Sequence, residues 1–215
     1  MRARSATLPA SLRRGFSLVE VLVAAAVVVL LVGLAVPMMR TYLRDGCEEE
    51  ALVEAKAIAQ ALQAFHDDLG VWPSRSSAGV DTMVWVLGSG ASVPTESPFL
   101  GSNPLADWLV DGVHGDTLDR HLRQNAPGGK PEGSYPIQGE RRWQGPYGAG
   151  PFPLDPWGRP YLVVVRSGTS THATRYKRLF VLSAGPDGVL DTPSDMTRTT
   201  EIHPADIGVV VSDRR

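Results

Sequence analysis

The sequence contains one cysteine, Cys47, in 215 residues. A single cysteine excludes an intramolecular disulfide framework, so the folded part of the chain has to be stabilised by a packed core. The chain also lacks an excess of either charge, because 21 Lys and Arg residues nearly balance 23 Asp and Glu residues and leave a formal net charge of -2. A basic surface for nucleic acid is therefore not expected.

The motifs of common catalytic and metal sites are missing as well. No glycine-rich phosphate loop precedes an expected helix. The five histidines show neither the spacing of zinc ligands nor a partner nucleophile motif: they are His66, His114, His121, His172 and His203. We therefore expect no catalytic residues and a protein that is not an enzyme.

One long uncharged apolar segment is present, from Val21 to Met39. It is close to the roughly 20 residues that cross a bilayer as a helix. Arg13 and Arg14 precede it, which places the N-terminus in the cytoplasm by the positive-inside rule. Glu20 lies at its start, where a carboxylate costs about 2.5 to 3.5 kcal/mol in lipid and therefore indicates a function.

The junction around Glu20 has the sequence RRGFSLVE, from Arg13 to Glu20. It resembles the type III signal peptide of type IV pilins and of the pseudopilins of type II secretion. The resemblance implies that prepilin peptidase cleaves between Gly15 and Phe16 and that Phe16 is then N-methylated. One helical turn separates Phe16 from Glu20, so a carboxylate and the terminal ammonium of a neighbouring subunit can neutralise each other in lipid. Glu20 is thus expected to be an assembly residue.

Three other interpretations of the N-terminus stay open. An ordinary secretory signal has an apolar core of about 7 to 15 residues, which is shorter than this segment, and no small-x-small cleavage site follows Met39. A twin-arginine export signal, which residues 11–16 loosely resemble, is opposed by the same length. A plain single-pass anchor, with Glu20 reaching toward the interface, predicts no processing at all.

Gly33 and Pro37 interrupt the apolar segment. Because proline removes one helical hydrogen bond, we expect a kink or a locally extended segment there. Beyond the segment, an amphipathic helix is predicted to end at Gly70 and Pro73. Its apolar residues recur every three or four positions and must be buried against a domain: they are Ala51, Leu52, Ala55, Ile58, Ala59, Leu62, Phe65 and Leu69.

The pattern is weaker in the middle of the chain. A strand or short helix is expected at 83–87 and a helix near 116–124. Between Pro127 and Gly150, glycine and proline break any regular period and predict loop rather than domain core. Three tryptophans are expected to fasten these loops: Trp85, Trp108 and Trp143.

The C-terminal part contains a second set of family-like residues. Asp155-Pro156-Trp157-Gly158-Arg159-Pro160-Tyr161 resembles the segment that opens the C-terminal sheet of the major pseudopilin of type II secretion, protein G. Trp157 is expected to plug this sheet against the helix. Apolar runs at 162–165 and 179–182 predict an antiparallel pair of strands, and a final strand is expected at 207–211.

A loop rich in glycine and acidic residues joins the last two expected strands. It resembles the calcium-binding loop of major pseudopilins, so the resemblance implies calcium as a cofactor. The implied ligands are four carboxylates and two backbone carbonyls: Asp187, Asp191, Asp195 and Asp206, with Leu182 and Ser183. Calcium accepts six to eight oxygens in irregular geometry. The spacing is not that of an EF-hand, and an acidic surface turn without metal stays the alternative.

Together these features predict an α+β, pilin-like fold. A long N-terminal helix, transmembrane in its first half and amphipathic in its second, would pack on a small C-terminal antiparallel sheet. The expected division is a leader peptide 1–15, a filament-core helix 16–39, a stalk helix 40–69, a loop-rich region 70–150 and a C-terminal sheet with the acidic loop 151–215.

The resemblance also implies a role. The chain would be a structural subunit polymerised into a short periplasmic filament that drives type II secretion. Its partners would be copies of itself, other pseudopilins, prepilin peptidase and the secretion platform of the bacterial inner membrane, with the N-terminus cytoplasmic and the domain periplasmic. A type IV pilus subunit and an unpolymerised, membrane-anchored binding module are the alternatives.

Overall fold

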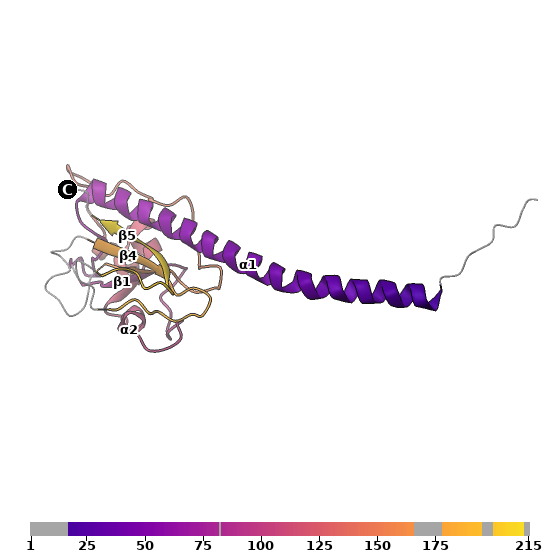
Figure 1. Cartoon of the computed structure of the whole chain (residues 1–215). Coiled ribbons are helices and arrows are strands. Elements are labelled where there is room, and N and C mark those ends of the chain that lie inside the picture. The colour runs from indigo at the N-terminus through magenta and orange to yellow at the C-terminus, as the bar shows by residue number, and fades with distance from the viewer. Residues whose placement is uncertain (1–16, 82, 166–177, 195–199, 213–215) are drawn as a thin grey trace, which may run out of the picture. The chain divides into compact units, whose positions relative to one another are not determined.

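The computed structural model describes residues 17–81, 83–165, 178–194 and 200–212, without the side chains of Pro37 and Arg40. Its chain forms two compact units, of which the first ends at Leu43 and the second begins at Arg44. Helix α1, Leu18–Leu69, is 52 residues long and contributes to both units (Figure 1).

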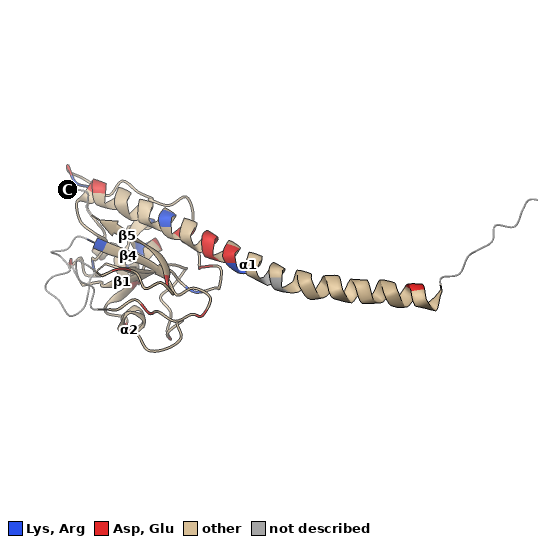
Figure 2. Cartoon of the chain, viewed as in Figure 1, with Lys and Arg blue, Asp and Glu red and all other residues tan. Residues whose placement is uncertain are grey.

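In the first unit, every described side chain of α1 is exposed. The apolar part of α1 has a mean hydropathy of 2.9 over 18 residues, which makes the helix long and apolar enough to cross a membrane. Glu20 is its only acidic or basic residue before Arg40 (Figure 2). An apolar surface on all sides of a helix is stable in lipid or against other helices.

Helix α1 continues through Gly33 and Pro37 as one element. Of the two expected outcomes, the locally extended segment is therefore not found, and the kink stays a prediction. A proline removes a single backbone N–H from the helical ladder, so the turns on either side can keep the helix continuous.

The second unit contains a five-stranded sheet in the order β2-β1-β3-β4-β5. Strand β3, Leu162–Val164, pairs antiparallel with β4, Arg178–Ser183, and β4 pairs antiparallel with β5, Ile207–Ser212. The predicted antiparallel pair, β3 with β4, is confirmed, and so is the expected final strand, which pairs with β4. The sheet is larger than predicted and mixed, because β1, Val86–Gly88, is antiparallel to β3 and parallel to β2, Gly115–Thr117.

Two short α-helices lie between these strands in the sequence. Helix α3, Leu118–Leu122, confirms the helix expected near 116–124. Helix α2, Pro104–Val110, was not predicted, although Asn103 caps it with an oxygen that accepts from the Leu105 amide, and Pro104 occupies its first turn. Asparagine followed by proline is a helix-start signal, so this sequence contained a usable indication.

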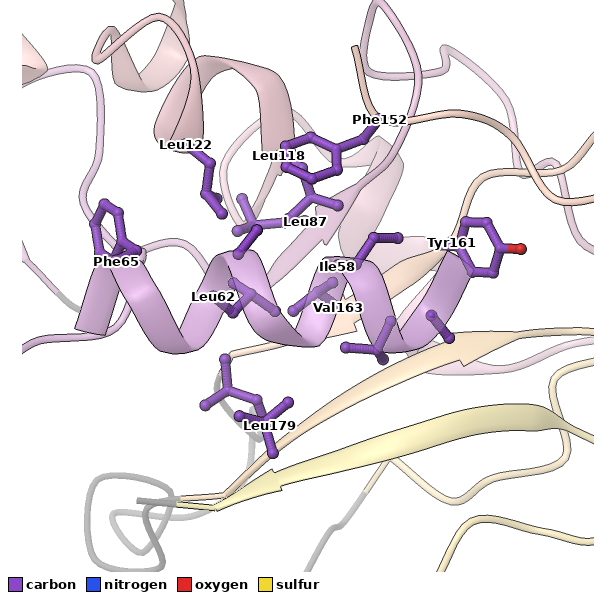
Figure 3. Close-up of a cluster of buried hydrophobic side chains, with 14 of the residues drawn as sticks. Ile58, Leu62, Phe65, Leu87, Leu118, Leu122, Phe152, Tyr161, Val163 and Leu179 are labelled. Atoms are coloured by element: carbon purple, nitrogen blue, oxygen red, sulfur yellow. The ribbon is translucent and has the colours of Figure 1, made fainter. Parts of the chain in front are cut away.

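Alternate residues of the strands pack into two clusters of buried side chains. Val163, Leu179 and Val181 join α1 in the first cluster, which Figure 3 shows. Leu162, Val164 and Phe180 join α2 in the second. The predicted apolar face of the amphipathic helix is confirmed, because six of its eight residues are buried and the other two, Leu52 and Ala59, are half-buried. The six buried residues are Ala51, Ala55, Ile58, Leu62, Phe65 and Leu69.

The region from Pro127 to Gly150 contributes to the core, so its description as loop outside the core is wrong. Tyr135 is 2% exposed and belongs to the first cluster, against which Trp143 and Tyr147 pack. The Trp143 Nε1–H donates to the carbonyl oxygen of His121 at 3.2 Å. Regular secondary structure is absent from most of this stretch, but large aromatic side chains bury area without it.

Replacing Phe65 by alanine is expected to lower the free energy of unfolding by about 3 to 5 kcal/mol. Phe65 is fully buried, and its ring packs edge-on against the rings of Tyr135 and Tyr147 at centroid distances of 4.9 and 5.5 Å. Denaturant unfolding of the detergent-solubilised chain, followed by tryptophan fluorescence, measures the change. Lys56→Ala, on the exposed face of the same helix, is the matched control and should change little. Equal stabilities of the two variants would contradict the packing described.

Candidate functional site

The residues predicted for processing and assembly lie at the start of α1. Gly15 and Phe16 are outside the described residues. Glu20 lies in the first turn of α1 with its side chain exposed, and the Val21 amide donates to the Ser17 carbonyl at 3.1 Å. An acid at a helix N-terminus is favoured by the helix dipole, but in an apolar segment it still needs a cationic partner. An exposed carboxylate is free to find that partner on another chain.

The segment that opens the C-terminal sheet is a turn built around Asp155. The Asp155 side chain is 4% exposed, and its Oδ1 accepts from the amides of Trp157 at 3.1 Å and Arg159 at 2.8 Å. The Gly158 amide donates to the Asp155 carbonyl at 2.8 Å, with Gly158 at a φ of +81°. This is the turn that the sequence predicts, and glycine is required at its left-handed position.

The contact between this turn and the helix is made by a different residue from the one predicted. Trp157 is half-buried and belongs to neither cluster of buried side chains. Tyr161 is fully buried, and its hydroxyl donates to Glu54 Oε2 at 2.6 Å and lies 3.3 Å from the Ala51 carbonyl oxygen. Burial, followed by the hydrogen bond to Glu54, raises the pKa of Tyr161. Tyr161 is therefore the aromatic residue that joins the sheet to α1.

The predicted calcium ligands are distributed over β4, the acidic loop and the start of β5. Leu182 and Ser183 lie in β4, opposite Gly208 and Ile207 of β5. Asp187 is exposed, and its Oδ1 accepts from the Val189 amide at 3.1 Å.

Asp206 is the most buried of the predicted acids that the structure describes. Its Oδ2 accepts from the Thr192 amide at 2.6 Å and from the Asp191 amide at 3.2 Å, and the Thr192 hydroxyl also donates to it. Burial raises the pKa of Asp206, and the hydrogen bonds from Thr192 act in the opposite direction. The carboxylate thus ties residues 191–192 to the start of β5.

These residues do not by themselves fit a calcium cage. Within the ranges that the structure describes, no group of three or more His, Cys, Asp or Glu side chains is placed to hold a metal ion. Asp195 lies outside those ranges. Calcium needs six to eight oxygens around one point, so calcium binding in this loop stays a prediction.

A buried polar network that the sequence did not reveal joins β2 to α3. Asp116 Oδ1 accepts from Arg120 Nη1 at 2.9 Å and from the Thr117 amide at 2.8 Å. Asp116 Oδ2 accepts from His121 Nε2 at 3.0 Å and from the Gly128 amide at 2.6 Å. Burial would raise the pKa of Asp116, but hydrogen bonds from His121, Gly128 and Arg120 outweigh it and lower the pKa to about 2.

His121 continues this network to Tyr135, since its Nδ1 lies 2.7 Å from the Tyr135 hydroxyl oxygen. The arrangement resembles a catalytic chain of acid, imidazole and hydroxyl, but His121 is 0% exposed and Asp116 and Tyr135 are each 2% exposed. A substrate cannot reach groups buried to this degree, so the network acts on the fold. Spacing in the sequence gives no sign of it, because Tyr135 lies 14 residues beyond His121 and meets it only in the folded chain.

Comparison with known families decides the identity of the N-terminal segment. Residues 11–36 match the model of the prokaryotic N-terminal methylation motif. The N-terminal segment of the chain is therefore similar to that of type IV pilin-like proteins. The matched residues include Gly15, Phe16 and Glu20, so the junction recognised in the sequence coincides with the family motif. A plain anchor and a secretory signal do not account for this match.

One curated protein with significant similarity is the type IV major pilin protein PilE1 of Neisseria gonorrhoeae, which is 30% identical to this chain over 70 residues. The aligned part covers 33% of this chain and 33% of that pilin. The pilin-like chain thus spans about one third of the length of the relative it matches. No solved structure shows significant similarity to the chain.

The N-terminal motif and the apolar helix together fit a membrane-anchored protein with a prepilin-type N-terminus. The motif ties the chain to subunits that are processed and N-methylated, and the apolar part of α1 suits a membrane anchor. The second unit confirms the α+β, pilin-like class, because a long N-terminal helix packs on a small sheet.

Proposed function

We propose that this pilin-like chain is a pseudopilin of a type II secretion system. Prepilin peptidase would cut between Gly15 and Phe16, Phe16 would be N-methylated, and the mature subunit would enter a short periplasmic filament. Before assembly it would sit in the bacterial inner membrane with a cytoplasmic N-terminus. The observation that carries this proposal is the methylation motif over residues 11–36, whose later part lies in the exposed apolar helix α1.

Glu20 would act at the assembly step. Among residues 16–39 it is the only acidic or basic residue, so a filament core built from these helices contains one side-chain carboxylate per subunit. The new N-terminal ammonium of an adjacent subunit supplies the opposite charge. Pairing the two charges offsets the cost of holding each in an apolar environment.

The choice of secretion over a pilus rests on the C-terminal half. The turn at Asp155 resembles the segment that opens the sheet of major pseudopilins, and the structure supports its role as a turn next to β3. Copies of this chain, other pseudopilins and the secretion platform would then be its partners. A type IV pilus subunit is the second candidate, favoured by the similarity to a major pilin over 70 residues.

Deletion of the chain in the bacterium that encodes it distinguishes these functions. Quantitative mass spectrometry of the culture medium is expected to show loss of a set of exported proteins, while electron microscopy shows surface pili unchanged. Complementation with the wild-type chain should restore export. Loss of pili with normal export would assign the chain to a pilus instead. If neither changes, both filament functions are contradicted and an anchored binding module remains.

A further inference from the structure

The acidic loop after β4 already contains a cation supplied by the chain itself. Arg159 comes from the turn at Asp155, and its Nη1 donates to the carbonyl oxygen of Gly185 at 3.2 Å. Its guanidinium lies directly over Gly188, where an added Cβ would be only 2.4 Å from the Arg159 Cζ. Gly188 has a φ of +74°, so its backbone and its missing side chain together make room for the guanidinium.

The first end of this loop is fixed by Asp155. Asp155 Oδ2 accepts from the Ser183 hydroxyl at 2.6 Å, while the Ser183 Oγ accepts from the Gly185 amide at 3.1 Å. The same carboxylate accepts from the Arg159 amide at 2.8 Å. One buried acid therefore positions both the loop and the residue whose guanidinium reaches it.

The other end of the loop is fixed by Asp206. Its carboxylate faces two amides, from Asp191 and Thr192, and the Thr192 hydroxyl. Donors point the positive ends of their dipoles at the carboxylate. A divalent cation at that position would have to displace these donors, each of which would then lose its partner in a buried place.

We propose that Arg159 is the resident cation of the loop 183–192, and that this loop keeps its fold without calcium. The guanidinium donates to the carbonyl oxygen of Gly185. The amide and the hydroxyl of Thr192 donate to the Asp206 carboxylate. A calcium ion placed between these groups would meet the positive charge of Arg159 and the Asp206 carboxylate, which already has three donors.

Amide hydrogen exchange of the full chain in detergent, read by mass spectrometry of peptides covering 183–192, tests the proposal. Exchange in the wild-type chain should be the same in millimolar calcium and in chelator. Arg159→Ala should exchange about ten-fold faster in both buffers, because it loses a charge-assisted hydrogen bond. Arg142→Ala is the matched control, since Arg142 donates to the Gly139 carbonyl at 3.1 Å in an exposed loop elsewhere. It should leave 183–192 unchanged.

Two results would overturn the proposal. One is slower exchange of 183–192 in the wild-type chain when calcium replaces the chelator, by about ten-fold or more. The other is an Arg159→Ala chain whose exchange in 183–192 equals that of the wild type. The comparison of the wild-type chain in calcium and in chelator needs no variant, so it tests whether calcium stabilises the loop even if Arg159→Ala does not fold. Peptides from α1 and β4 report global unfolding in the same experiment.

Discussion

Replacing Glu20 by glutamine is expected to leave the chain in the membrane and to remove it from the filament. Glutamine keeps the size of the side chain and makes insertion in lipid easier, because no charge has to be buried. The N-terminal ammonium of the neighbouring subunit then has no counter-charge in the apolar core. A penalty of about 2.5 kcal/mol for each uncompensated charge corresponds to about a 70-fold loss at every subunit contact.

The measurement for Glu20→Gln is the fraction of chain recovered in sheared filaments, compared with the fraction recovered in membranes after carbonate extraction. Glu96→Gln is the matched control, because Glu96 is an exposed acid of the second unit. It should assemble as the wild type does. If Glu20→Gln chains enter filaments at the wild-type level, the carboxylate has no assembly role and the apolar helix is an inert anchor.

Replacing Asp116 by asparagine is expected to lower the free energy of unfolding of the second unit by about 3 to 5 kcal/mol. Four donors converge on this buried carboxylate, from Arg120, His121 and the Thr117 and Gly128 amides. An asparagine amide group would turn N–H bonds toward two of these donors and leave them without an acceptor. Denaturant unfolding of the chain in detergent measures this loss.

Asp107→Asn provides the control for Asp116→Asn. Asp107 is exposed in α2, so the same chemical change there should shift the unfolding free energy by no more than about 0.5 kcal/mol. Equal effects at positions 116 and 107 would show that the network contributes nothing to the fold.

The contribution of Asp116 should also depend on pH in a defined window. Its pKa is lowered from 3.8 to about 2 in the folded chain, so the unfolded chain binds the proton more readily. The stabilisation, about 2 kcal/mol, is fully present above pH 3.8 and is lost as the pH falls through 2. The stability difference between the wild type and Asp116→Asn should therefore shrink by about that amount between pH 5 and pH 2. A difference that stays constant over this range would contradict the assigned role.

The parts of the fold that could be predicted from the sequence are those with a local, periodic signal. The stripe from Ala51 to Leu69 repeats every three or four residues, and the strands at 162–164, 178–183 and 207–212 are short runs rich in β-branched and apolar residues. Burial of one helix face and of both sheet faces determines these patterns. Strand β2 has only three residues, Gly115–Thr117, and carries no such pattern.

The parts that could not be predicted depend on contacts between distant residues. Asp116, His121 and Tyr135 form their network only when the segment around 135 folds back on α3. Trp157 and Tyr161 stand four residues apart, and nothing local shows that Tyr161 is the one that reaches α1. The acids of the loop after β4 can be counted in the sequence, but the donors that face Asp206 appear only in the folded chain.

The mass of the protein recovered from its native membrane tests most directly whether this chain is processed as a pilin-type subunit. Intact mass and N-terminal analysis should find a chain that begins at Phe16 and carries one added methyl group. A chain that retains Met1 would contradict processing and leave a plain anchor. Cleavage beyond Met39 would mean that the whole apolar segment is a disposable export signal.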